Sequence, residues 1–125
     1  MSDYLSKLKE IVKEDQRYDL EAYLFVNQAL EFLLGKLGKK RHVSGQELLE
    51  GIREYALQEY GPLSKNVLEY WGIYSCEDFG EIVFNMVGKK LMGKTERDSK
   101  KDFRHGYNFE EAFERPFRRQ DSGEK

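Results

Sequence analysis

LEAYLFVNQALEFLLGKLG, residues 20–38, is the most apolar part of this chain and sets the fold class that the sequence predicts. Its apolar residues recur every three or four positions, which is the spacing of one face of an α-helix. The main stripe consists of Leu20, Tyr23, Leu24, Asn27, Leu30, Leu33, Leu34 and Leu37. Because Phe25, Ala29 and Phe32 cover a second face, this helix is apolar nearly all round, and we expect it at the centre of a helical core.

Asp19 can cap this central helix, and Gly35 and Gly38 lie near its end, where a left-handed residue can stop a helix. Further helices are predicted on both sides of this stretch. Residues 3–13 carry apolar residues at helical spacing, and Ser44 with Glu47 forms a capping box that starts a helix ending at Gly61-Pro62. A short helix follows at 64–71, and Ser75 with Asp78 repeats the capping signature before a helix that reaches about residue 91. On that last helix Gly80, Phe84 and Gly88 recur every four residues, which indicates close approach of another backbone.

The sequence therefore predicts a mainly α, single small domain of five to six helices over residues 1–117, with residues 118–125 forming a disordered tail. Residues 89–104 lose the helical period, and two alternatives stay open for them. They form either a solvated loop or a β-hairpin that turns near 96–99, and the hairpin would make the fold winged-helix-like. The aromatic residues from Phe103 to Phe117 are expected to pack onto the core, with Asn108 capping a short helix.

Charge and cysteine content narrow the function classes. Lys and Arg number 21 against 23 Asp and Glu, and the net charge of −2 provides no overall field for nucleic acid or an anionic membrane. The one cysteine, Cys76, has no partner for an intramolecular disulfide, and charged residues interrupt the first ten positions where a signal peptide would be apolar. Residues 22–34 are shorter than the about 20 apolar residues that cross a bilayer. We expect a cytoplasmic protein without a membrane partner.

One outline indicates nucleic-acid binding. The helix at 64–71, a glycine-containing turn and the capped helix after Ser75 follow the order of a helix-turn-helix. Residues 89–104 hold seven basic and three acidic residues, a net charge of +4. The candidate nucleic-acid contacts are Lys89, Lys90, Lys94, Arg97, Lys100, Lys101 and Arg104. Against this, Glu77, Asp78 and Glu81 place carboxylates at the start of the would-be recognition helix, where they repel phosphate.

Catalytic candidates are few. A metal site of His42, His105 and either Asp98 or Asp102 is conceivable, but the histidines lack the spacing of a known ligand motif. Cys76 lies in the first turn of a helix, where a thiol pKa falls in principle, yet no base is nearby. Trp71, close to Tyr70 and Tyr74, is interpreted as a core residue rather than a ligand platform. The sequence thus predicts no cofactor, no resident metal and no enzymatic activity, with a small metal-dependent enzyme as the weakest hypothesis.

Several short motifs carry a family resemblance. They are Arg41-His42, Ser44-Gly45, Glu47-Leu48-Leu49, Tyr60-Gly61, Trp71-Gly72-Ile73, Asp78-Phe79-Gly80, Ile82-Val83-Phe84 and Asp102-Phe103. Over residues 23–113 the chain resembles the hypothetical-protein family of Planctomycetes and Verrucomicrobia. The resemblance implies a bacterial, cytoplasmic setting and no mechanism, and it marks Arg41, His42, Trp71 and Asp78 as a candidate functional surface.

The leading hypothesis is a non-enzymatic protein-interaction or regulatory module that binds a protein partner whose identity the sequence does not give. The alternative is a winged-helix-like nucleic-acid-binding protein. Neither pattern nor composition determines the oligomeric state.

Overall fold

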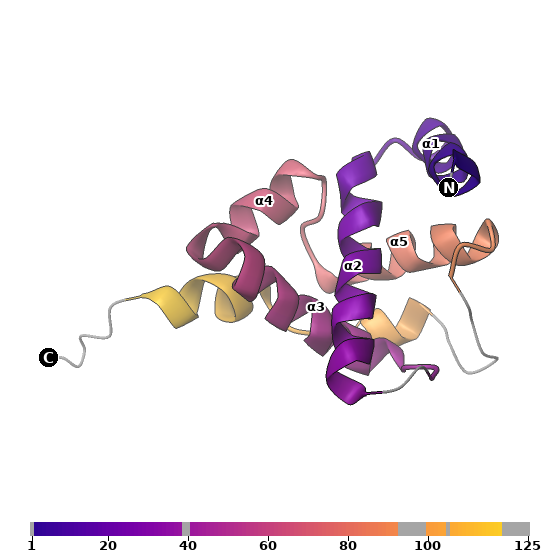
Figure 1. Ribbon diagram of the computed structural model, residues 1–125. Helices are drawn as coiled ribbons and strands as arrows, with labels where there is room; N and C mark the ends of the chain where they lie inside the picture. Colours follow the sequence, from indigo (N-terminus) through magenta and orange to yellow (C-terminus); the bar gives the residue numbers. More distant parts are fainter. Residues whose placement is uncertain (1, 39–40, 93–99, 105, 119–125) are drawn as a thin grey trace, which may run out of the picture.

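The computed structural model describes residues 2–38, 41–92, 100–104 and 106–118 (Figure 1). These residues form five α-helices: α1 (Ser2–Glu14), α2 (Leu20–Leu37), α3 (Gly45–Tyr60), α4 (Ser64–Tyr70) and α5 (Cys76–Gly88). Short turns complete this part of the chain: the 3-10 helices η1 (Gly61–Leu63), η2 (Lys100–Phe103) and η4 (Arg115–Phe117), and the π-helix η3 (Glu110–Glu114). The predicted small helical domain is confirmed.

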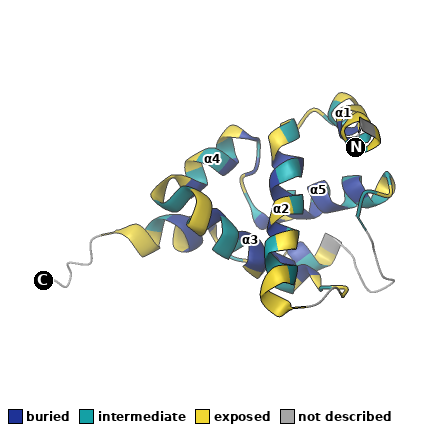
Figure 2. Cartoon of the chain, in the orientation of Figure 1, coloured by how far each residue is buried: buried dark blue, intermediate teal, exposed yellow. Residues whose placement is uncertain are grey.

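Helix α2 stands at the centre of the molecule, with α3 on one side and α1 and α5 on the other (Figure 1). Its first three turns bury Ala22, Tyr23, Phe25, Val26 and Ala29. Figure 2 shows this burial ending in the last turns of α2, where exposed residues predominate. Helix α3 still covers one side of these turns, since the ring centroids of Phe32 and Tyr55 are 5.3 Å apart and Leu33 lies beside Gly51.

The ends of the helices follow the predicted capping chemistry. Asp19 accepts a hydrogen bond from the Glu21 amide at 2.9 Å, and Gly38 ends α2 with a φ of 77°, a left-handed conformation that favours glycine. At α3 the capping box is complete, since the Glu47 amide donates to Ser44 Oγ at 3.0 Å and the Ser44 amide donates to Glu47 Oε1 at 2.9 Å.

A buried serine fixes the bend between α3 and α4. The Ser64 side chain is fully buried, and its hydroxyl lies 2.9 Å from the carbonyl oxygen of Ala56 and 2.7 Å from that of Gly61. Ala56 lies within α3, and Gly61 directly follows its last residue. The hydroxyl thus ties the start of α4 to the end of α3.

Helix α5 buries Phe79, Ile82, Val83 and Met86 against the core. The expectation that its glycines admit another backbone is corrected by the structure. A Cβ on Gly80 would lie 3.0 Å from the side chain of Phe103, while a Cβ on Gly88 would meet nothing within 4 Å. The missing side chain at Gly80 leaves space for the Phe103 ring. At Gly88 no neighbouring atom would contact an added Cβ.

Most of the C-terminal aromatic residues complete the core, as the sequence predicts, but the prediction is wrong for Phe117, which is 47% exposed. Phe103, Phe109 and Phe113 are buried, and the Tyr107 hydroxyl donates to the carbonyl oxygen of Leu49 at 2.7 Å. The Asn108 side chain accepts from the amides of Glu110 and Glu111, and so caps the short helix predicted there.

The predicted hairpin is not seen in the described residues. Its second arm, Lys100–Phe103, is the 3-10 helix η2, which packs against α3 and α5. The physical reason is Phe103, whose ring lies beside Gly45 and Gly80 and is held there by a compact turn rather than an extended edge. The predicted turn at 96–99 and the tail from 119 to 125 lie outside the described residues.

Candidate functional site

The structure divides the four predicted surface residues between two places. Arg41 and His42 border a pocket beside the C-terminal half of α2, whereas Trp71 and Asp78 lie near the other end of that helix. The Asp19 amide, at the start of α2, donates to the Trp71 carbonyl oxygen at 3.0 Å. With a rise of about 1.5 Å per residue, Asp19 and Leu34 are roughly 22 Å apart along the helix, so the four residues do not form one site.

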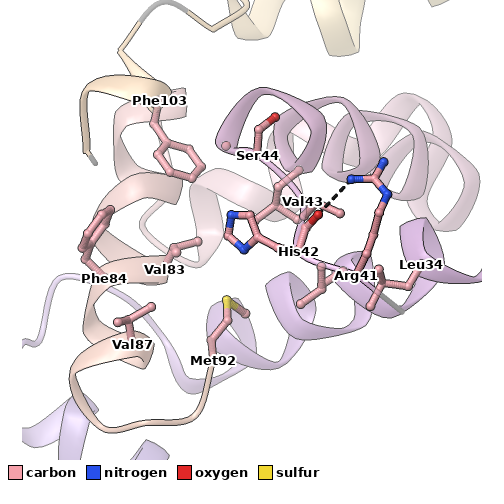
Figure 3. A pocket seen from close by; sticks show the side chains of 13 residues that line it. Leu34, Arg41, His42, Val43, Ser44, Val83, Phe84, Val87, Met92 and Phe103 are labelled. Atoms are coloured by element: carbon pink, nitrogen blue, oxygen red, sulfur yellow. Dashed lines mark hydrogen bonds between the residues drawn. The ribbon is translucent and has the colours of Figure 1, made fainter. Parts of the chain in front are cut away.

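The first place, which we name the apolar pocket, has a volume of about 360 Å³. Helix α2 forms one wall and α5 the opposite wall, and η2 and the segment before α3 close two further sides (Figure 3). Most of the residues that line it are apolar: Leu30, Leu34, Val43, Gly45, Leu48, Val83, Phe84, Val87, Met92 and Phe103. The polar lining residues among those described are Arg41, His42 and Ser44.

An ion pair fixes the polar edge of the apolar pocket. Arg41 Nη2 donates to Glu47 Oε2 at 2.8 Å, and Arg41 Nη1 donates to the carbonyl oxygen of His42 at 2.8 Å. The hydrogen bond from Arg41 lowers the pKa of Glu47 to about 2, with a further contribution from the Ser44 amide. Arg41 and Glu47 therefore stay charged and paired at neutral pH.

The imidazole ring of His42 points across the apolar pocket toward Val83 of α5 (Figure 3). His105 and Asp98 lie outside the described residues, and within the described ranges no three His, Cys, Asp or Glu side chains are grouped so that they could hold a metal ion.

The second place is an aromatic surface, which we name the tyrosine face: Tyr70, Tyr74 and Arg17 around a shallow hollow. Tyr70 is 84% exposed and Tyr74 is 64% exposed. Trp71 lies between them in sequence but is only 9% exposed, and its ring packs 5.5 Å from Phe25 and 5.9 Å from Tyr60 between centroids. The interpretation of Trp71 as a core residue is confirmed, while its two neighbours point outward.

A partly buried polar network holds the tyrosine face in place. The Tyr18 hydroxyl donates to Asp78 Oδ1 at 2.5 Å, and Asp78 Oδ2 accepts from the amides of Tyr74 at 2.8 Å and Ser75 at 3.2 Å. Burial, followed by the hydrogen bond to Asp78, raises the pKa of Tyr18 well above its ordinary value. Asp78 is thus a positioning residue that ties the segment before α5 to the turn before α2.

Arg17 belongs to the same network. Its guanidinium contacts Asp15 at 2.7 Å and Glu81 at 3.2 Å, and its carbon Cζ lies 5.1 Å from the centre of the Tyr18 ring. These contacts, first of all the hydrogen bond from Arg17, hold the pKa of Asp15 well below its usual range. The positive charge of Arg17 is therefore balanced by two carboxylates.

The structure describes the side chains of four of the predicted nucleic-acid contacts, Lys89, Lys90, Lys101 and Arg104. Lys89 turns back onto α1, where its ammonium group lies 3.3 Å from carboxylate oxygens of both Glu10 and Glu14. Lys90, Lys101 and Arg104 are exposed. Lys94, Arg97 and the side chain of Lys100 lie outside the described residues.

The Cys76 thiol is buried and protonated at neutral pH in this fold. Its side chain is 4% exposed, and burial raises the pKa of the thiol to about 11. The expected effect of the helix start is too small to offset this desolvation.

Both surface features depend on residues that the sequence pattern assigns elsewhere. Periodicity places Leu30 and Leu34 in helix packing, and it gives Phe84 no role beyond separating two glycines on α5, yet all three line the apolar pocket. One sequence feature does indicate the pocket: α2 and α5 each carry apolar residues on more than one face. Neighbouring helices do not cover all of these residues. For the tyrosine face, the signal is a pair of tyrosines flanking a glycine-containing turn.

No helix in the described ranges is both long enough and apolar enough to span a membrane. The resemblance to the Planctomycetes and Verrucomicrobia family stays a prediction. Compared with protein-family models, with curated proteins and with solved structures, the chain has no match.

Proposed function

We propose that this chain is a non-enzymatic protein-interaction module that binds a protein partner through the tyrosine face. The observation that carries the proposal is the exposure of Tyr70 (84%) and Tyr74 (64%) on two sides of one hollow. Tyrosine, tryptophan and arginine are enriched among the residues that contribute most to protein–protein binding. Two tyrosines and an arginine meet here on one surface.

The geometry favours binding because the face is already rigid. Tyr74 follows directly on the Trp71-Gly72-Ile73 turn, whose tryptophan is anchored in the core, and its amide is held by Asp78. A tyrosine ring has only two side-chain torsions, so ordering it on binding costs little conformational entropy. A partner would therefore meet a surface that needs little rearrangement.

The charges around the hollow favour a basic partner segment. Asp19 and Glu69 line it together with Arg17, and Lys65 balances Glu69 at 2.8 Å. The guanidinium of Arg17 is outnumbered by the two carboxylates that it contacts. Negative charge thus exceeds positive charge around the hollow, and the faces of exposed tyrosine rings attract Lys and Arg side chains. We therefore expect a partner segment that carries lysine or arginine.

The proposal is non-enzymatic because the nucleophile candidate is deactivated. The Cys76 thiol, with a pKa raised to about 11, is protonated at neutral pH. The nucleic-acid alternative still rests on the helix-turn-helix outline and the basic residues after α5. Of those residues, Lys89 is paired with Glu10 and Glu14, and this pairing weakens it as a phosphate contact. The bacterial, cytoplasmic setting is part of the proposal and rests on the family resemblance.

Site-specific photo-crosslinking in the native host tests the proposal. A photoreactive phenylalanine analogue replaces Tyr70 or Tyr74 in turn, and the control places it at Leu37, an exposed residue at the end of α2 opposite to Asp19. We expect one discrete adduct from positions 70 and 74 and none from 37. Peptide mapping should locate the crosslink in a Lys- or Arg-rich segment of the partner.

A charge neutralisation sharpens the test. Asp19→Asn removes the negative charge beside the hollow and keeps a side-chain oxygen that can still cap α2. In the chain labelled at position 74 it should reduce the adduct about threefold. The matched control, Glu59→Gln on the exposed surface of α3, should leave the adduct unchanged. Equal adducts from 37 and 70, or none from 70 and 74, would exclude the tyrosine face as the docking surface.

A further inference from the structure

The apolar pocket is separate from the tyrosine face and has the size of a ligand site. Its volume of about 360 Å³ falls in the range of small-molecule pockets. It has room for about twelve non-hydrogen atoms if each takes the roughly 30 Å³ of a liquid water molecule. The volume therefore limits a ligand to about the size of an alkylated benzene ring.

The walls of the pocket are mostly hydrocarbon. Leu34 lies on the α2 wall and Val87 on the α5 wall, and Phe84 and Phe103 contribute two aromatic rings (Figure 3). Walls of this kind bind an apolar body better than they bind water. The two rings also favour a ligand that carries a ring of its own, because aromatic rings attract one another when they pack edge to face or offset.

The polar side chains along the remaining edge already have partners within the protein. Arg41 donates to the Glu47 carboxylate and to the carbonyl oxygen of His42, each at 2.8 Å. The Ser44 hydroxyl accepts from the Glu47 amide at 3.0 Å, and His42 is not free either. Burying a charge is costly unless the charge gains an ion pair or new hydrogen bonds. This edge therefore disfavours an ionised ligand and admits an uncharged one.

From the volume, the apolar walls and the engaged polar edge, we propose that the apolar pocket binds a small, uncharged, apolar molecule with an aromatic ring. A partner's side chain is the less favoured occupant. It would bring peptide groups to an edge whose hydrogen-bonding side chains are already engaged, whereas a free molecule brings none. The site goes beyond the proposed protein interaction and does not depend on it.

Methionine methyl NMR on the full chain tests this site. The sequence has three methionines, and Met92 lines the apolar pocket while Met86 is fully buried and does not. Propylbenzene is titrated against ¹³C-methyl-methionine protein, beside two ions of the same shape, 3-phenylpropanoate and 3-phenylpropylammonium. We expect propylbenzene to shift the Met92 signal at submillimolar concentration and to leave Met86 in place. Both ions should bind at least tenfold more weakly.

Filling the pocket gives a second test. Val87→Phe places a ring in the space, and we expect it to weaken propylbenzene at least tenfold. The matched control, Val67→Phe, makes the same exchange at a partly buried position of α4 outside the lining, and should leave the affinity unchanged. An unshifted Met86 signal shows that a variant is folded. If Val87→Phe loses that signal, Leu34→Phe on the α2 wall serves instead.

Each of four results would overturn the proposal. An unmoved Met92 signal at the solubility limit of propylbenzene would remove the site, and equal or tighter binding of either ion would remove the uncharged class. Unchanged affinity in a folded, filled variant would place the binding elsewhere. Tighter binding of N-acetyl-phenylalanine amide than of propylbenzene would make the pocket a seat for a partner's side chain. Since Met92 reports on the pocket and the crosslinks report from residues 70 and 74, either proposal can fail alone.

Discussion

Asp78 shows how one side chain serves two structural purposes. The sequence predicts it as the third residue of a helix cap, and the amide of Ser75 does donate to it at 3.2 Å. The same carboxylate also accepts from the Tyr18 hydroxyl at 2.5 Å, a contact that spans 60 positions in the sequence. Local spacing predicts the first bond, but only the tertiary packing that brings the turn before α2 against α5 creates the second.

A double-mutant cycle on this pair should show strong coupling. Tyr18→Phe removes a hydrogen bond to a charged group, and we expect it to lower the free energy of unfolding by about 1.5 kcal/mol. Asp78→Ala should cost about 3 kcal/mol, since it also leaves the buried Tyr18 hydroxyl without an acceptor. Urea unfolding of the two variants and their combination should give a total well below the sum. Strict additivity would contradict the contact.

Cys76 should alkylate slowly in the native protein. The thiolate is the reacting form, and burial raises the pKa from the ordinary 9.0 to about 11. At pH 8 the ionised fraction falls about a hundredfold relative to the unfolded chain, given one decade per pH unit. Iodoacetamide labelling followed by mass spectrometry should therefore be about 100-fold slower without urea than with it, and it should accelerate as the pH rises toward the raised pKa. Equal rates would show that the thiol is exposed.

At the scale of elements, the turn between α4 and α5 depends on a glycine. Gly72 has a φ of 95°, and a Cβ there would lie 2.2 Å from the carbonyl oxygen of Arg17. Gly35, inside α2, has ordinary helical geometry and nothing within 4 Å of such a Cβ. The same substitution is therefore expected to have opposite effects at the two positions.

Gly72→Ala should lower the free energy of unfolding by about 3 kcal/mol, from backbone strain and the forced separation of Arg17. Gly35→Ala should raise it by about 0.5–1 kcal/mol, because alanine has the higher helix propensity. Urea denaturation followed by circular dichroism measures both. A loss at Gly35 comparable to that at Gly72 would contradict the open space and ordinary helical geometry at Gly35.

Helix positions and most helix ends can be predicted from the sequence because they depend on neighbours three or four residues away. Asp19, Ser44 and Gly38 are examples, and each caps the helix that the sequence assigns to it. The region after α5 cannot be predicted in this way. The turn at Lys100–Phe103 depends on Phe103 finding space beside Gly45 and Gly80, which lie far away in sequence.

The candidate sites can be predicted only in part. The sequence identifies Arg41 and His42 as surface residues, but the pocket they border also needs Leu34 and Val87, which periodicity assigns to the core. Trp71 is identified correctly as a core residue, whereas the exposure of its two tyrosine neighbours follows from how α4 packs against α3. Whether an apolar side chain is covered depends on tertiary packing, and periodicity alone does not contain that information.

At the scale of the whole molecule, the core is continuous. Phe25 of α2, Tyr60 of α3 and Trp71 after α4 are in mutual ring contact, and Phe113 from η3 joins the same buried cluster. Such a core should unfold as one unit. Because the chain has a single tryptophan, fluorescence reports from one point of this core.

We expect the urea transitions measured by Trp71 fluorescence and by far-ultraviolet circular dichroism to coincide in midpoint and slope. Coincident transitions would support the single domain predicted over residues 1–117. A fluorescence transition that precedes the loss of helix by a clear margin in urea would show instead that the aromatic cluster separates before the helices melt.

The late position of Phe103, Phe109 and Phe113 has a consequence for biosynthesis. These rings cover Gly80, Phe79 and neighbouring apolar groups on helices that leave the ribosome earlier. A nascent chain that stops before residue 103 would form helices but leave apolar side chains exposed on one side. Chaperones and proteases would bind such a chain. Chaperones and proteases would thus recognise interrupted chains by their exposed apolar surface. In the full-length chain, Phe103, Phe109 and Phe113 cover that surface.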